Sequence, residues 1–212
     1  MIKILIADDH AIVRHGLKQL IADNADMTVA GEASNGLEVL ALIRQNRLDV
    51  VLLDISMPGK NGVEILKQIH SEQPNLQVLI LSTYPEDQYA VRVIKAGAAG
   101  YLTKESAPEQ LVSAIRAVAQ GKKFIVAPVV ELLANELGGH KGGGLAPHEA
   151  LSDREFQVFR LMAGGKTASE IAQRLSLSVK TVSTYRSRIM LKMNLKNNAE
   201  LTFYAVKNGL VE

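Results

Sequence analysis

The sequence has no cysteine, which excludes disulfide bonds, thiolate metal sites and cysteine nucleophiles. It also has no tryptophan, and aromatic residues make up only 4% of the chain. No apolar run approaches the ~18 residues that a membrane-spanning helix needs. The first residues run into Asp8 and Asp9 without a small-residue cleavage site, which argues against a signal peptide. These absences predict a cytoplasmic protein that has no membrane partner.

The balance between acidic and basic residues differs between the two ends of the chain. Residues 1–120 contain 11 Lys and Arg against 14 Asp and Glu, a net charge of −3. Residues 151–212 contain 10 against 5, a net charge of +5. An acidic first part and a basic last part indicate two domains, the second facing a polyanion. Ordinary scatter in composition explains the split equally well, so the motifs must decide.

Short apolar runs alternate with helical repeats through the first part of the chain. Helical spacing of apolar residues separates each run from the next. Five strands that alternate with five helices predict an α/β fold, a doubly wound five-stranded parallel sheet covered on both faces. The expected strands are residues 3–7, 27–33, 50–54, 77–81 and 101–102.

Reactive side chains follow four of these strands directly. Right-handed crossovers bring the carboxyl ends of parallel strands to one edge of the sheet, where ligands bind in such folds. Three carboxylates held together repel one another, so we expect a divalent hard cation, and Mg²⁺ suits carboxylate, carbonyl and water ligands. One Asp can then act as a nucleophile towards phosphoryl groups, with a lysine and a hydroxyl holding the oxygens. The residues concerned are Asp8, Asp9, Asp54, Ser82 and Lys104.

Each of these residues also has an ordinary explanation when it is taken alone. A carboxylate after a strand is often a helix cap, and Lys104 alone is a typical surface lysine. Tyr101 fits a simple core position. His10 and His15 fit the polar face of the first helix, and we assign them no chemistry. The joint occurrence on four strand ends favours a single pocket.

Residues 1–120 resemble the receiver domain of two-component response regulators, which has a flavodoxin-like fold. The resemblance rests on ADD at 7–9, DISMPG at 54–59, LST at 81–83 and KAGAAGYLTK at 95–104. It implies that a histidine kinase phosphorylates Asp54. It also implies that Mg²⁺ binds to Asp8, Asp9, Asp54 and the backbone carbonyl of Ser56.

The same resemblance assigns a switch to the other pocket residues. Lys104 would pair with the phosphoryl group, Ser82 would move to bind it, and Tyr101 would turn inward behind it. Many receivers have Thr in place of Ser82 and a small residue in place of Thr83. The larger Thr83 side chain would narrow access to the phosphoryl group.

Glycine is concentrated at residues 138–149, which indicates a flexible joint. We therefore expect a receiver domain over 1–121 and a linker over 122–149. The linker would contain a short helix at about 128–137. The remaining residues, 150–212, would form a small all-α domain.

The last 62 residues have the signals of a helix-turn-helix. Ser152 to Glu155 and Thr167 to Glu170 match capping boxes. A third helix is expected from Val179 to about Met193, with Val182, Ile189 and Met193 facing the core. Its other faces are polar and contain no acid, which favours DNA over an ordinary solvated face.

Residues 151–195 resemble the LuxR-type helix-turn-helix, and with the receiver they resemble the NarL/FixJ family of response regulators. The resemblance makes 180–192 the recognition helix and a helix at 199–207, capped by Asn198, the dimerisation element. Tyr185 stands where the family often has His. The expected dimer contacts are Leu201, Tyr204 and Ala205. The expected DNA contacts are Lys180, Thr181, Ser183, Thr184, Tyr185, Ser187, Arg188 and Lys192.

These features predict a transcription factor that a histidine kinase switches through Asp54 and that binds double-stranded promoter DNA as a homodimer. One alternative is a phosphatase in which Asp54 is a catalytic intermediate. No general acid beside Asp54 and no substrate-covering insertion support it, so we do not expect an enzyme. A second alternative is a DNA-binding protein whose receiver only dimerises, but an idle pocket would not need all of these side chains.

Overall fold

The computed structural model describes residues 1–57, 62–83, 86–106, 108–137 and 146–211, without the side chains of 86–88 and 135–137. Pro58 and Gly59 of the DISMPG motif and the glycine-rich residues 138–145 lie outside the described residues. The chain folds into two compact units, Met1–Gly139 and His140–Glu212. Within the described part, no helix is long and apolar enough to cross a membrane.

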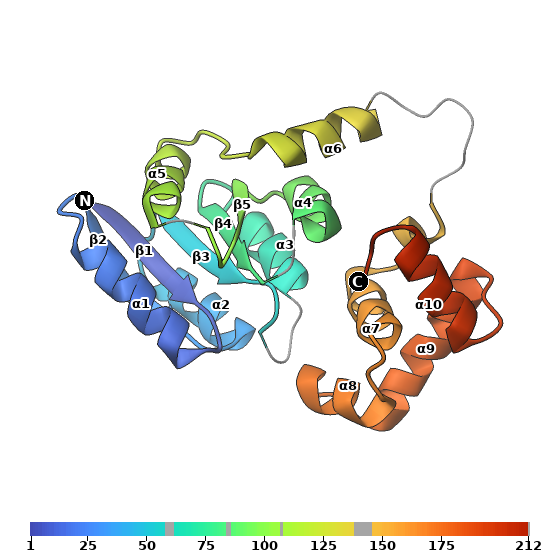
Figure 1. The fold of residues 1–212 in the computed structure, drawn as a ribbon. Coiled ribbons are helices and arrows are strands. Elements are labelled where there is room, and N and C mark those ends of the chain that lie inside the picture. The colour runs from blue at the N-terminus through green and yellow to red at the C-terminus, as the bar shows by residue number, and fades with distance from the viewer. Residues whose placement is uncertain (58–61, 84–85, 107, 138–145, 212) are drawn as a thin grey trace. The chain divides into compact units, whose positions relative to one another are not determined.

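The first unit is built on one parallel sheet with the strand order β2-β1-β3-β4-β5 (Figure 1). This confirms the predicted doubly wound fold. The order changes direction between β1 and β3, and such a reversal opens a crevice at the carboxyl ends of the strands. The strands are β1 (Ile2–Ala7), β2 (Met27–Ala33), β3 (Val50–Asp54), β4 (Gln77–Ser82) and β5 (Gly100–Thr103).

Helices cover both faces of this sheet. The helix α1 packs against α5, and α2 packs against α3, so two pairs form on the two faces, while α4 packs beside β5 and against α6. Asn35 begins α2 because its side chain accepts hydrogen bonds from the amides of Leu37 and Glu38. The helices are α1 (Ala11–Ala22), α2 (Gly36–Gln45), α3 (Gly62–Glu72), α4 (Glu86–Lys95), α5 (Pro108–Ala119) and α6 (Ala127–Leu137).

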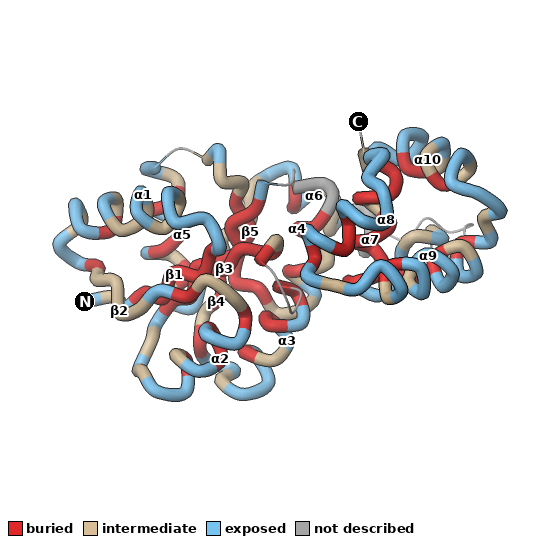
Figure 2. Tube along the Cα trace, turned by 90° about the horizontal axis from the view of Figure 1, so that it is seen from below, coloured by how far each residue is buried: buried red, intermediate tan, exposed pale blue. Residues whose placement is uncertain are grey.

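The strand β3 lies at the centre of the hydrophobic core. All five of its residues are buried, as an unbroken apolar run between two helix layers requires (Figure 2). The neighbouring strands β1 and β4 pair with β3 on either side. The last residue of β3, Asp54, therefore lies between two neighbouring strands at the carboxyl end of the sheet.

The second unit is entirely helical in its described residues. Both predicted capping boxes are present, with Ser152 opposite Glu155 and Thr167 opposite Glu170. The last helix begins differently from the prediction, because Asn197 and not Asn198 accepts the amide of Glu200. The elements are the 3₁₀ helix η1 (Pro147–Ala150) and the helices α7 (Asp153–Ala163), α8 (Ala168–Leu175), α9 (Val179–Met193) and α10 (Asn198–Lys207).

A tight turn joins α8 to α9. Ser176 adopts the left-handed conformation at φ 53° and ends α8, and Ser178 caps α9 through the amide of Thr181. Val182 and Ile189 are buried where α9 packs against α7 and α8, as their spacing predicted. The polar faces of α9 are consequently turned outward.

Candidate functional site

The carboxyl edge of the sheet gathers the predicted acidic residues. Asp54 ends β3, and Asp8 follows β1, the strand that pairs with β3. Both carboxylates are 1% exposed, whereas Asp9 is exposed. Ligand atoms of Asp8, Asp9, His10 and Asp54 all lie within 4.8 Å of one another. Four side chains from two strand ends therefore form one acidic pocket.

Lys104 enters this pocket from the segment that follows β5. Its Nζ lies 2.8 Å from Asp54 Oδ2 and 2.6 Å from Asp8 Oδ2. Its backbone amide donates to the carbonyl of Ser82 at 2.7 Å, which fixes the segment to β4. Burial alone would lower the pKa of Lys104, but the two carboxylates outweigh that effect and raise it. Lys104 is therefore a permanent cation in the pocket.

One lysine does not balance the two buried carboxylates. Burial raises the pKa of Asp54, and Asp8 raises it further, although Lys104 and the amide of Ser56 at 2.9 Å from Oδ1 work against them. The Oδ2 atom of Asp8 is buried, and it contacts the same Lys104 Nζ that pairs with Asp54. A further cation would relieve this charge, and the oxygen-rich donor set fits a divalent metal ion.

His10 also faces the acidic pocket, which the sequence analysis did not foresee. Its Nδ1 lies 2.9 Å from Asp9 Oδ1 and 3.2 Å from Asp8 Oδ1. The only sequence signal was its position directly after the acid pair.

The predicted switch residues lie around the same edge. Ser82 ends β4 and is buried, and Tyr101 is buried in β5. Thr83 follows Ser82 and is exposed. The Tyr101 ring is therefore turned away from solvent.

The outer face of α9 presents most of the predicted DNA contacts. Lys180, Ser183 and Arg188 are exposed, as are Thr184 and Ser187, while Thr181 and Tyr185 are partly exposed. Thr184 and Ser187 donate their hydroxyl protons to backbone carbonyls one turn earlier in the helix. Their oxygens can still accept hydrogen bonds from base edges.

Lys192, one of the predicted DNA contacts, pairs with a buried carboxylate in this structure. Its Nζ lies 2.6 Å from Glu155 Oε2, and Glu155 is only 3% exposed. Burial alone would raise the pKa of Glu155, but Lys192 and the capping box with Ser152 lower it overall. Lys192 therefore joins α9 to α7 through an ion pair, and its contact with DNA stays a prediction.

Two of the three predicted dimer contacts on α10, Leu201 and Ala205, need correction. Leu201 and Ala205 are 0% exposed, because that face of the helix packs into its own domain. The Tyr204 hydroxyl lies 2.7 Å from His148 Nδ1 in η1. The exposed large apolar side chains of α10 are Phe203 and Val206, three residues apart and so on one face.

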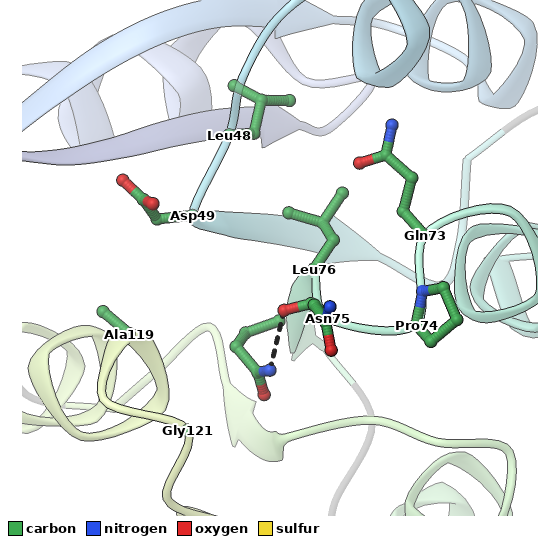
Figure 3. Close-up of a pocket in the computed structure, with 9 residues that line it drawn as sticks. Leu48, Asp49, Gln73, Pro74, Asn75, Leu76, Ala119 and Gly121 are labelled. Atoms are coloured by element: carbon green, nitrogen blue, oxygen red, sulfur yellow. Dashed lines mark hydrogen bonds between the residues drawn. The ribbon is translucent and has the colours of Figure 1, made fainter.

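A separate cavity of about 590 Å³ lies at the opposite, amino end of β3 and β4. Figure 3 shows Asp49 and Gln73 among its lining residues. The carboxylate of Asp49 already accepts the backbone amide of Lys3 at 2.8 Å. With this single carboxylate engaged, the cavity offers no arrangement like that of the acidic pocket.

Comparison with known proteins matches both parts of the chain to known domains. Residues 4–116 match the response regulator receiver domain, and residues 149–205 match the bacterial regulatory proteins of the luxR family. The response regulator UvrY of Escherichia coli K12 is 37% identical over 211 residues, which span 99% of this chain and 96% of UvrY.

Solved structures of RcsB are also similar to the chain. RcsB from Salmonella enterica serovar Typhimurium, bound to promoter rprA in the presence of phosphomimetic BeF₃⁻, has a TM-score of 0.65 and 28% identity, covering 96% of this chain and 97% of RcsB. A structure of two RcsB dimers on two parallel DNAs has a TM-score of 0.60 and 28% identity, covering 97% and 98%.

Proposed function

The chain belongs to the response regulators that join a receiver domain to a LuxR-type DNA-binding domain, and from this premise we propose how its own residues perform the switch. It is a DNA-binding regulator and not an enzyme that turns over a substrate. We assign the receiver to 1–121, the linker to 122–149 and the DNA-binding domain to 150–212. The protein acts in the cytoplasm, on phosphoryl groups from a sensor histidine kinase.

The buried carboxylate of Asp54 is the phosphoryl acceptor. Its oxygen attacks phosphorus, the bond from phosphorus to the kinase histidine breaks, and the electron pair leaves with the imidazole nitrogen. Lys104 Nζ, which lies 2.8 Å from Asp54 Oδ2, then forms an ion pair with a phosphoryl oxygen. The carboxylates of the acidic pocket and the Ser56 carbonyl would hold Mg²⁺, and the ion would supply positive charge to the transferring group; these carboxylates are Asp8, Asp9 and Asp54. The surplus of buried negative charge is the observation that supports this assignment.

Ser82 couples the charge of the phosphoryl group on Asp54 to the conformation of the receiver surface. Ser82 is the last residue of β4, and its buried hydroxyl can donate a hydrogen bond to a phosphoryl oxygen. Tyr101 is buried in β5, which pairs with β4, and the exposed Thr83 beside Ser82 would limit solvent access to the phosphoryl group. The phosphoryl group thereby biases the β4 and β5 ends towards one arrangement.

The helix α9 reads DNA. Its exposed hydroxyls suit base edges in the major groove, and Lys180, Arg188 and Tyr185 suit phosphate oxygens. Two copies bind paired half-sites as a homodimer. We assign the contact between copies to the outer face of α10, with Phe203 70% and Val206 53% exposed, in place of the buried Leu201 and Ala205.

The switch is tested by a DNA-binding titration at fixed salt concentration on a library of sites. The samples are the wild type and Asp54→Ala, each with and without Mg²⁺ and a small phosphoryl donor. Treatment should tighten specific binding of the wild type and leave Asp54→Ala unchanged. An exposed Asp elsewhere, Asp23→Ala, serves as the control and should respond as the wild type does. Equal binding by all samples would refute the phosphorylation switch.

The dimer face is tested by sedimentation of the protein bound to a two-half-site DNA. Phe203→Glu should convert the complex of two copies into a complex of one. Ala199→Glu adds the same charge at an exposed position of α10 and should leave the pair intact. If Phe203→Glu still binds this DNA as two copies, the contact between copies does not lie on this face of α10.

A further inference from the structure

The chain that follows α5 stays attached to the sheet. Phe124 forms an isolated parallel bridge with Gly100 of β5, and its backbone amide donates to the carbonyl of Ala99 at 2.8 Å. The Nζ of Lys123 donates to the carbonyl of Ala98, also at 2.8 Å. A Cβ on Gly100 would lie 2.5 Å from the carbonyl oxygen of Phe124, so this close approach depends on glycine. The linker therefore begins as a short addition to the outer edge of the sheet.

The helix α6 continues this attachment on α4. It packs against α4 within the first unit (Figure 1). Val129 of α6 is 1% exposed, whereas its neighbour Val130 is 50% exposed. Phe124 and Val126 pack against the hydrophobic core of the receiver. We call residues 122–134 the strap, because they tie the linker to β5 and α4.

The strap is held by few buried side chains. Within residues 122–134, the Val129 side chain is the one that is buried. A helix of 11 residues, the length of α6, is marginal in water unless packing supports it. Segments with few buried apolar contacts open locally at a low cost in free energy. The strap can therefore detach, and α6 unwind, while the sheet stays folded.

The strap contacts the elements that the proposed switch changes. Its bridge to Gly100 lies one residue before Tyr101, and β5 leads on to Lys104, which pairs with Asp54 in this structure. In the proposed function, Lys104 and Ser82 bind the phosphoryl group and the ends of β4 and β5 take another arrangement. An element with two arrangements changes the affinity of any segment that contacts them differently. The strap is therefore placed to respond to the phosphoryl group.

We propose that the strap, docked on β5 and α4 in this structure, is released when Asp54 is phosphorylated and thereby lengthens the tether of the DNA-binding domain. The inference rests on the proposed function. Residues 138–145 can span at most about 28 Å, whereas residues 122–145 can span at most about 84 Å. Half-sites one helical turn apart are separated by about 34 Å. Release therefore gives each DNA-binding domain the reach to occupy its half-site while the receivers remain free to move. In the competing interpretation, the strap is a permanent part of the receiver.

The first experiment is hydrogen exchange of the full-length protein with and without Mg²⁺ and a small phosphoryl donor. After treatment, the amides of Phe124 and of α6 should exchange about tenfold faster or more, and those of β1 should not change. Asp54→Ala should show no change. If the wild type binds DNA more tightly after treatment but the strap exchanges as before, the strap proposal is wrong and the switch stands. If DNA binding does not tighten either, the proposed function fails and the strap proposal fails with it.

The second experiment releases the strap without phosphorylation. Val129→Asp places a charge in the buried contact between α6 and α4, which should detach the strap. The untreated variant should bind a two-half-site DNA about threefold more tightly or more than the untreated wild type. Val130→Asp puts the same charge at an exposed position of α6 and should bind as the wild type does. Slow exchange in β1 and β3 verifies that the receiver stays folded. Equal affinities of the two variants would overturn the proposal.

Discussion

Each of the two units contains a buried carboxylate in contact with a lysine, and the two pairs behave in opposite ways. Asp54 lies 2.8 Å from Lys104 Nζ in the first unit, and Glu155 lies 2.6 Å from Lys192 Nζ in the second. Both carboxylates are almost fully buried. Nevertheless the pKa of Asp54 is raised and the pKa of Glu155 is lowered.

The difference lies in how many carboxylates share each lysine. Asp54 shares Lys104 with Asp8, so burial of two negative charges outweighs one cation. Among the described residues, Glu155 is the one carboxylate that pairs with Lys192, and it also accepts the amide of Ser152 in the capping box. A buried pair with surplus charge is suited to bind a cation or a phosphoryl group, whereas a balanced pair joins two helices.

The largest expected effect is on phosphorylation, which should depend on the Asp54 pair and not on the Glu155 pair. Asp54→Asn removes the nucleophilic oxygen, so phosphorylation by a small donor should fall by about 100-fold or more. Phosphate-affinity electrophoresis measures it. Glu155→Gln makes the same change in the other buried pair and should leave phosphorylation unchanged. A similar loss in both variants would mean that folding, not chemistry, was affected.

Removing the lysine of the balanced pair should chiefly affect stability. Lys192→Met leaves Glu155 buried without its cation, and we expect the free energy of unfolding of the second unit to fall by about 2 kcal/mol. The figure is below that of a fully buried pair, because the Lys192 side chain is 40% exposed and solvent screens it. Hydrogen exchange in α7 and α9 measures the loss. Lys180→Met, at an exposed site of α9, should change the free energy of unfolding little. Equal losses in both variants would mean that the ion pair of Lys192 with Glu155 does not stabilise the unit.

A metal ion should stabilise only the unit with surplus charge. Mg²⁺ at ten times its dissociation constant should add about 1.4 kcal/mol to the first unit, since it binds the folded state alone. Slower hydrogen exchange in β1 and β3, with no change in α7, would show this. Asp54→Ala should reduce the gain. Equal slowing in α7 would indicate a nonspecific effect of salt.

The smallest effect is the pH dependence of the balanced pair. The pKa of Glu155 is lower in the folded than in the unfolded protein, whose value is near 4.5. Its stabilisation is therefore complete above pH 4.5 and is lost as pH falls through the folded value. The difference in unfolding free energy between the wild type and Glu155→Gln, under about 1 kcal/mol from this source, should narrow in acid. A difference that widens below pH 4.5 would contradict the sign.

The contribution of Asp54 to stability should change with pH in the opposite direction. Its folded pKa is raised, so ionisation costs stability as pH rises from the unfolded value near 3.8 through the folded one. Replacing Asp54 with Asn should consequently stabilise the first unit at neutral pH and have no such effect in acid. Denaturant titrations across this range would check the opposite trends, and parallel trends would remove the contrast between the pairs.

The sequence alone determined those features that depend on neighbouring residues. Periodicity of two kinds located the five strands and the helices around them, and the S-x-x-E and T-x-x-E patterns located the starts of α7 and α8. The strand ends predicted that Asp8, Asp54 and Lys104 would meet, because parallel strands place their carboxyl ends at one edge. Spacing also identified the buried face of α9.

Only the tertiary structure decided which side chains became partners. Lys192 and Glu155 are 37 residues apart, and nothing near Lys192 in the sequence distinguishes it from a lysine that binds phosphate. Leu201 and Phe203 are both apolar residues of α10, yet packing buries the first and exposes the second. His10 fits a polar-face residue until its ring is seen beside the acids. A local pattern fixes the conformation of a segment, but the direction in which each face points depends on the segments that pack against it.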